Sequence, residues 1–311
     1  MLSRRVVRIK IMQLLYALRS DESLTAQEAV RRYQEYVQKT FEFYLLNLQY
    51  FIAVAEYAKK DGEIRKAKLR PLPEDEIFRP KIAENTLFKS LSQDKGANNL
   101  ISKYGIKDLI KDDHIKRAYN DFAKTDDYRK YLLNKNSTDQ DHLEVMLALY
   151  RYLTASESFN EDMEDTYFSW EDDKSLVVGA MKKTIKGLPA KEGFYEEFLP
   201  DQEVTKDFGE NLLKLACAKD KEILKIIEPN LRNWDADRVA VLDMVAIKLG
   251  ITEFLEFKSI PTKVTLNEYV EIAKLFSSDK SKDFVNGILD RILKKLQKDE
   301  LIVKEGRGLL D

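Results

Sequence analysis

Residues 281–296, "SKDFVNGILDRILKKL", indicate the fold class most clearly. Their apolar side chains recur three or four positions apart, which is the spacing of one face of an α-helix. The pair Asn286-Gly287 interrupts the first turns, where a glycine costs about 1 kcal/mol relative to alanine. We therefore expect an amphipathic helix with an unusual glycine. Its apolar face would consist of Phe284, Val285, Ile288, Leu289, Ile292, Leu293 and Leu296.

The composition of the whole chain agrees with a helical protein. Of 311 residues, 44% are hydrophobic and 34% are charged, whereas only 11 are glycine and 7 are proline. So few helix breakers among so many good helix formers predict an all-α protein. No apolar run reaches the length of about 18 residues that indicates a membrane span. The single Cys217 excludes an internal disulfide and fits a reducing compartment, so we expect a cytoplasmic protein.

Charge is distributed unevenly along the chain, although the net charge is only −2. Residues 1–20 contain five basic residues and no acidic one, whereas residues 157–173 contain eight acidic residues and no basic one. Separate basic and acidic segments of this kind suggest separate interaction surfaces.

Two helices are predicted in the N-terminal region. The first covers about 4–18, and the second begins at a capping box formed by Thr25 and Glu28 and continues to about residue 60. A proline-punctuated linker follows, and then short helical segments up to about residue 135. Because 60–135 is the least periodic stretch, we interpret it as an insertion.

The domain boundary is expected near residue 200, after a glycine- and proline-containing connection. Residues 1–200 would form an N-terminal helical subdomain with a basic first helix and the insertion, and 201–311 a C-terminal helical subdomain. Within the latter, Thr265 and Glu268 have the spacing of a capping box, which predicts a helix beginning at Thr265.

Residues suited to catalysis are scarce. His114 and His142 are the only histidines, and neither has a second His or Cys at the spacing of a metal site. Nothing local pairs Cys217 with either histidine, and no glycine-rich phosphate loop is present. We therefore expect no enzyme activity, no cofactor and no metal.

Two groups of residues are suited to binding nucleic acid. Arg4, Arg5 and Arg8 lie near the start of the first helix, where their charge suits phosphate, although a solubilising surface patch explains them equally well. The second group lies between two C-terminal helices and combines lysines with aromatic rings, as single-stranded RNA surfaces do. Phenylalanine at helical spacing is more often part of a core. This group consists of Phe276, Lys280, Lys282 and Phe284.

The C-terminal third resembles the NusB family of transcription antitermination factors. Ordered matches extend over residues 233–292, and residues 4–18, "RRVVRIKIMQLLYAL", are similar to the first helix of that family. Lys248, Gly250, Thr252 and Tyr269 depart from the family pattern, and the middle of the chain is much longer, as in a long form with an enlarged middle region. The matching residues include Trp234, Asp237, Arg238, Asp243, Glu253, Ile260, Pro261, Asn267, Glu268, Glu271 and "FVNG" at 284–287.

The resemblance implies an all-helical protein of two subdomains without catalytic activity. Members bind boxA-type nascent ribosomal RNA together with NusE, a small-subunit ribosomal protein, and act on the RNA polymerase elongation complex. Carried over by position, the RNA-binding residues would be Arg4, Arg5, Arg8, Gln13, Phe276, Lys280, Lys282 and Phe284. Gly287 would then allow a neighbouring helix to approach closely and so position the loop before it.

Two other functions stay open. The chain could be an RNA-modifying enzyme with a NusB-like domain, although it lacks a glycine-rich cofactor loop and ends soon after the NusB-like part. It could also be a protein-interaction scaffold, in which the acidic residues 157–173 recruit a basic partner.

Overall fold

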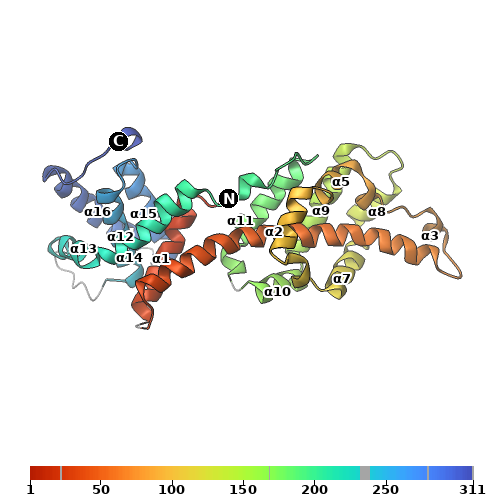
Figure 1. Cartoon of the computed structure of the whole chain (residues 1–311), viewed down its shortest axis with the longest axis horizontal. Coiled ribbons are helices and arrows are strands. Elements are labelled where there is room, and N and C mark those ends of the chain that lie inside the picture. Colours follow the sequence, from red (N-terminus) through yellow and green to blue (C-terminus); the bar gives the residue numbers. More distant parts are fainter. Residues whose placement is uncertain (22, 168, 232–238, 279, 310–311) are drawn as a thin grey trace. The chain divides into compact units, whose positions relative to one another are not determined.

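The computed structural model describes residues 1–309 except residues 22, 168, 232–238 and 279. The part of the chain that it describes consists of helices and loops without any strand, so the all-α prediction is confirmed (Figure 1). The motif residues Trp234, Asp237 and Arg238 lie outside the described residues.

The chain divides into two compact units. The middle unit comprises Gln38–Leu199 with Met1, and the terminal unit comprises Leu2–Val37 and Pro200–Asp311. This division differs from the expected one, because the first helix, α1 (Arg4–Ser20), belongs with the C-terminal residues. The reason is its apolar face, which buries Val7, Ile11 and Met12 where α1 packs against helices of the terminal unit.

The long helix α2 (Ala26–Lys66) contributes residues to both units. The backbone N–H of Glu28 donates to the Thr25 hydroxyl oxygen at 3.2 Å, so Thr25 caps this helix as predicted. The helix continues six residues beyond the predicted end at residue 60, and a short helix, α3 (Pro73–Ile77), follows. Its proline occupies the first turn, where a missing N–H removes no helical hydrogen bond.

The middle unit is built around α9 (Asp139–Ala155), which Thr138 and Asp141 cap reciprocally. Its apolar residues belong to one hydrophobic core, to which α2 and the short helices between residues 81 and 133 also contribute. Helix α9 packs against α4, α5, α7, α8, α10 and α11. The other elements of this unit are α4 (Lys81–Glu84), α5 (Thr86–Ser92), α6 (Lys95–Lys103), η1 (Ile106–Leu109), α7 (Asp112–Phe122), α8 (Asp126–Leu133), α10 (Glu157–Thr166), α11 (Trp170–Lys186) and η2 (Glu196–Phe198).

The acidic segment 157–173 is part of this core. It forms α10 and the first turn of α11, and it buries Phe159, Met163 and Trp170. Three of its acidic residues, at 171–173, lie in the first turn of α11, where the helix dipole favours negative charge. Part of the acidic run therefore has a structural explanation.

The terminal unit is built around α14 (Val241–Glu256), which is buried on most sides. It packs against α1, α12, α13, α15 and α16. Together with α1 and the start of α2, the unit contains η3 (Glu203–Glu210), α12 (Asn211–Ala218), α13 (Asp220–Ile227), η4 (Glu228–Asn230), α15 (Thr262–Phe276), α16 (Ser281–Lys298) and η6 (Gly306–Leu309).

Helix α16 confirms the amphipathic pattern of residues 281–296. Val285, Ile288, Leu289 and the later apolar residues of the stripe are buried, and Phe284 is half-buried. The explanation of Gly287 is wrong, however. This glycine is exposed, and a Cβ atom placed on it would meet no atom within 4 Å. Close packing instead requires Gly209, whose Cβ would lie 2.0 Å from the Tyr33 hydroxyl and 2.6 Å from a Val7 methyl.

The predicted start of α15 is also wrong. The helix begins at Thr262, directly after Pro261, so Thr265 lies inside it rather than at its N-cap. The Thr265 hydroxyl donates to a side chain of α14, at 2.7 Å from Glu253 Oε1. A tertiary hydrogen bond therefore uses the hydroxyl that the local pattern assigned to capping.

No helix in the described part of the chain is long and apolar enough to cross a membrane.

Candidate nucleic-acid interface

Helix α1 presents its basic residues to the rest of the terminal unit. Ser3 caps the helix, since its hydroxyl oxygen accepts from the Val6 N–H at 3.3 Å. Arg4 then donates to Glu203 Oε1 at 2.7 Å across to η3. Both side chains of this pair reach solvent, so the guanidinium of Arg4 remains accessible to an anion.

Arg5 forms a two-pronged ion pair with Glu268 of α15. Its Nε and Nη2 atoms donate to the two carboxylate oxygens at 2.8 and 2.7 Å. These hydrogen bonds lower the pKa of Glu268 and raise the pKa of Arg5. The Arg5 side chain is half-exposed, so part of its guanidinium faces solvent.

Arg8 is buried, unlike its two neighbours. Its side chain is 3% exposed, and its Nε and Nη2 atoms donate to Glu253 of α14 at 2.9 and 2.6 Å. The Glu253 carboxylate is fully buried and also accepts from the hydroxyls of Thr265 and Tyr269, at 2.7 and 3.1 Å. The guanidinium lies 5.0 Å from the centre of the Phe208 ring. Every oxygen of this carboxylate thus has two donors, as a buried charge requires.

Burial affects the titration of this cluster. Burial by itself lowers the pKa of Arg8, but the hydrogen bonds and charge of Glu253 outweigh it, and the net pKa is raised. Burial and the neighbouring Glu253 charge also raise the pKa of Tyr269. The network therefore keeps Arg8 charged and Tyr269 protonated.

The assignment of Arg8 to an RNA phosphate needs correction. Its side chain is almost fully buried, and its guanidinium already donates two hydrogen bonds to Glu253, so little of it can meet a phosphate. The ion pair of Arg8 with Glu253 holds α1 against α14, while Arg4 and Arg5 remain at the surface. Gln13, further along α1, is half-buried.

The second predicted group lies at the junction of α15 and α16. Phe276 is 40% exposed at the end of α15, Lys280 and Lys282 are exposed, and Phe284 is half-buried. The hydroxyl of Ser281, the first residue of α16, lies 2.8 Å from the hydroxyls of both Ser277 and Ser278. These serine contacts hold the described part of the loop against the start of α16.

Helix α15 contains Phe276 of the second group and Glu268, the ion-pair partner of Arg5. Glu268, the partner of Arg5, lies eight residues before Phe276, which corresponds to about 12 Å along the helix axis. Arg5 and the loop after Phe276 are thus attached to the same helix of the terminal unit, at positions about 12 Å apart along its axis.

Several residues of this site were not predicted from the sequence, namely Glu253, Thr265, Tyr269 and Phe208 around Arg8. One signal was available. Glu253 is the one carboxylate in "AIKLGITEFL", residues 246–255, a mostly apolar stretch, and a carboxylate buried there needs a cation as partner. The sequence does not say which cation that is.

Comparisons with known proteins match the C-terminal half of the chain. The NusB family model matches residues 145–294. This match includes the acidic segment 157–173, to which the motif resemblance assigned no counterpart, and it does not include α1. No solved structure matches the chain.

The chain is similar to proteins named transcription antitermination protein NusB in several bacteria. It is 38% identical to that of Salinibacter ruber over 36% of this chain and 70% of the relative. Identity to the Chloroherpeton thalassium protein is 37% over 34% of this chain and half of that relative. Identity to the Listeria monocytogenes protein is 42% over 28% of this chain and 67% of the relative. The match to the Salinibacter ruber protein, which covers more than two thirds of that relative, shows that the chain belongs to the NusB family.

Proposed function

We propose that this protein is a non-enzymatic transcription antitermination factor that binds boxA-type single-stranded RNA together with NusE. In this proposal it acts within the RNA polymerase elongation complex. Support comes from the relatives, which are named transcription antitermination proteins. The single observation that carries the RNA-binding part is the exposed Phe276 beside Lys280 and Lys282, on the same unit as Arg4 and Arg5.

Each residue has a proposed role. Lys280, Lys282, Arg4 and Arg5 neutralise phosphates, because their charged groups are accessible to solvent. The exposed ring of Phe276 stacks on a base. Gln13 and Phe284, both half-buried, contribute at the margin of this surface, and Arg8 positions α1 without contacting RNA.

A titration with labelled boxA-type RNA, with and without NusE, tests this function. We expect the intact protein to bind boxA-type RNA more tightly than a scrambled RNA of equal length, and NusE to strengthen the difference. The variant Lys280→Ala/Lys282→Ala should bind more weakly. Its matched control is Lys295→Ala/Lys298→Ala, which removes two exposed lysines from the other end of α16.

The alternatives predict different results. Equal binding of both RNAs, or equal losses in the two double variants, would contradict specific RNA recognition at this loop. A protein that binds NusE but binds neither RNA would favour a scaffold. A rise in melting temperature with S-adenosylmethionine would favour an RNA-modifying enzyme. The scaffold is the less supported of these, because the acidic segment buries Phe159 and Trp170 in the core.

A further inference from the structure

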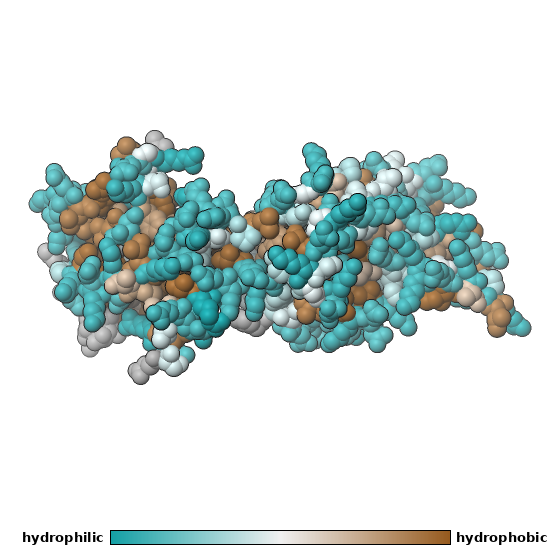
Figure 2. All heavy atoms as spheres, viewed as in Figure 1, coloured by the Kyte–Doolittle hydropathy of each residue, from teal (hydrophilic) through white to brown (hydrophobic). Residues whose placement is uncertain are grey.

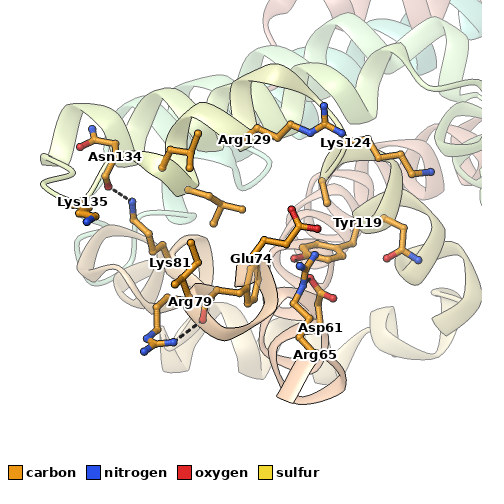
Figure 3. Close-up of a pocket in the computed structure, with 16 residues that line it drawn as sticks. Asp61, Arg65, Glu74, Arg79, Lys81, Tyr119, Lys124, Arg129, Asn134 and Lys135 are labelled. Carbon is orange, nitrogen blue, oxygen red and sulfur yellow. Dashed lines mark hydrogen bonds and ion pairs between the residues drawn. The ribbon is translucent and has the colours of Figure 1, made fainter. Parts of the chain in front are cut away.

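The middle unit contains a pocket of about 980 Å³ that the proposed RNA-binding function does not use. It lies between the end of α2, α3, the start of α4, and the ends of α7 and α8 (Figure 3). Basic side chains outnumber acidic ones in its lining by six to two. Figure 3 shows Arg79, Lys81 and Lys135 at one end and Lys124 and Arg129 at the other, with Glu74 between them.

The basic residues fall into two classes. Arg65 pairs with Asp61 and Asp75, and Lys124 pairs with Asp121. Lys81 uses its ammonium to hold the loop after α8, donating to the carbonyl oxygens of Tyr131 and Asn134 and to the Ser137 hydroxyl. These three cations are engaged within the fold.

The other class is available to a ligand. Arg129 and Lys135 are exposed and have no ion-pair partner among the described residues, and Arg79 hydrogen-bonds only to the backbone carbonyls of Glu76 and Phe78. Three positive charges at the edge of one pocket thus lack a carboxylate. Charge complementarity calls for an acidic ligand.

The pocket also has an open aliphatic wall. Ile77 is 71% exposed and Leu133 is 75% exposed, and both line it. Figure 2 shows hydrophobic atoms at the surface of the middle unit where Figure 1 places α3. Burying two such side chains against a partner is favourable at about 25 cal/mol per Å² of apolar surface.

We propose that this pocket docks an acidic, amphipathic peptide segment of a partner protein, a function beyond RNA binding. Glutamates or aspartates of the segment pair with Arg79, Arg129 and Lys135, and its aliphatic side chains cover Ile77 and Leu133. A helix laid in a groove offers both kinds of side chain at three- and four-residue spacing.

RNA fits the pocket less well. Single-stranded RNA surfaces present exposed aromatic rings for stacking, whereas the aromatic residues here, Tyr119 and Phe78, are buried, and Tyr119 is bonded to Asp61. A small ligand also fits less well, because such sites enclose most of the ligand surface, and here two wall residues remain largely open to solvent.

A direct test uses a fluorescein-labelled helical peptide of Glu, Leu and Ala, with leucines three and four positions apart, and fluorescence anisotropy with the full chain. We expect Arg129→Glu/Lys135→Glu to weaken binding about tenfold or more, because two attractions become repulsions. Ile77→Ser/Leu133→Ser should weaken it severalfold. The matched control is Lys89→Glu/Arg117→Glu, which makes the same charge change at exposed residues of the middle unit outside the pocket.

Four outcomes would overturn the proposal. They are no binding of the peptide, equal losses in the two charge-reversed variants, equal binding of a peptide with serine in place of leucine, and tighter binding of labelled oligouridine at this same pocket. All of the substituted residues are exposed, so a circular-dichroism spectrum like that of the unsubstituted protein is expected for each variant. These outcomes are independent of boxA binding, because no residue of the pocket belongs to the proposed RNA surface.

Discussion

Arg8 and Glu253 form a buried two-pronged ion pair between residues 245 positions apart in sequence. This pair joins α1 to α14 and explains why the N-terminal helix belongs to the terminal unit. Its fully bonded carboxylate, with Thr265 and Tyr269 as further donors, makes the position of α1 specific.

Removing one partner of this pair should destabilise the protein strongly. We expect Arg8→Met to lower the free energy of unfolding by about 3–5 kcal/mol, because it leaves Glu253 buried without its cation. The double variant Arg8→Met/Glu253→Leu should recover much of that loss. Urea denaturation of Arg8→Met, of Glu253→Leu and of the double variant gives the coupling energy of the pair.

The control for this cycle is Arg31→Met. Arg31 also pairs with two carboxylates, those of Glu28 and Glu35, but at the surface. Its loss should change the free energy of unfolding by no more than about 1 kcal/mol. Similar effects of Arg8→Met and Arg31→Met would refute the structural role of the buried pair.

Two glycine substitutions should have opposite effects. Gly287→Ala should raise the free energy of unfolding by about 0.5–1 kcal/mol, because the site is open and alanine favours helix. Gly209→Ala should lower it by about 1–3 kcal/mol, because the new Cβ would collide with Tyr33 and Val7. Thermal unfolding of both variants measures this. Destabilisation by Gly287→Ala would restore a packing role for that glycine.

Acid should weaken the contact between α1 and α15. Arg5 lowers the pKa of Glu268 from its ordinary value of 4.5. A carboxyl group with a lowered pKa stabilises the fold fully above its unfolded value, and this contribution is lost as pH falls through the folded-state pKa. We therefore expect the stability advantage of the wild type over Glu268→Gln to shrink as pH falls below 4.5.

Melting temperatures of both proteins at a series of pH values measure this advantage. The comparison variant is Glu271→Gln, a half-exposed glutamate on the same helix that pairs with Lys274 at 4.0 Å and acts on Arg5 only through its charge, so it should lose less of the advantage in acid. An advantage over Glu268→Gln that stays constant from neutral pH to well below 4.5 would argue against the Arg5–Glu268 contribution.

The salt dependence of RNA binding should report the two loop lysines. Each phosphate contact on a single strand contributes about 0.7 to the slope of log K against log salt. Lys280→Ala/Lys282→Ala should therefore reduce the slope by about 1.4, and Lys295→Ala/Lys298→Ala should leave it unchanged. An unchanged slope in the first variant would remove both lysines from the phosphate contacts.

Local features of the fold were predictable where the pattern itself carries the information. The stripe of α16 is buried as its spacing predicts, and Thr25 caps α2. The capping box predicted at Thr265 is wrong, although its pattern is equally good, because the helix begins earlier, after Pro261, and the Thr265 hydroxyl donates its hydrogen bond to Glu253. A local pattern cannot show that a tertiary partner competes for the same group.

The sequence by itself determined the helical class, the amphipathic faces and the basic character of residues 4–8, since each depends on the identity and spacing of neighbouring residues. Only the tertiary structure decided that Arg8 is buried while Arg4 and Arg5 remain accessible. It also decided that Gly209 rather than Gly287 is confined. The physical reason is that burial and ion pairing depend on which distant segments meet, and residues one turn apart on a helix can face quite different surroundings.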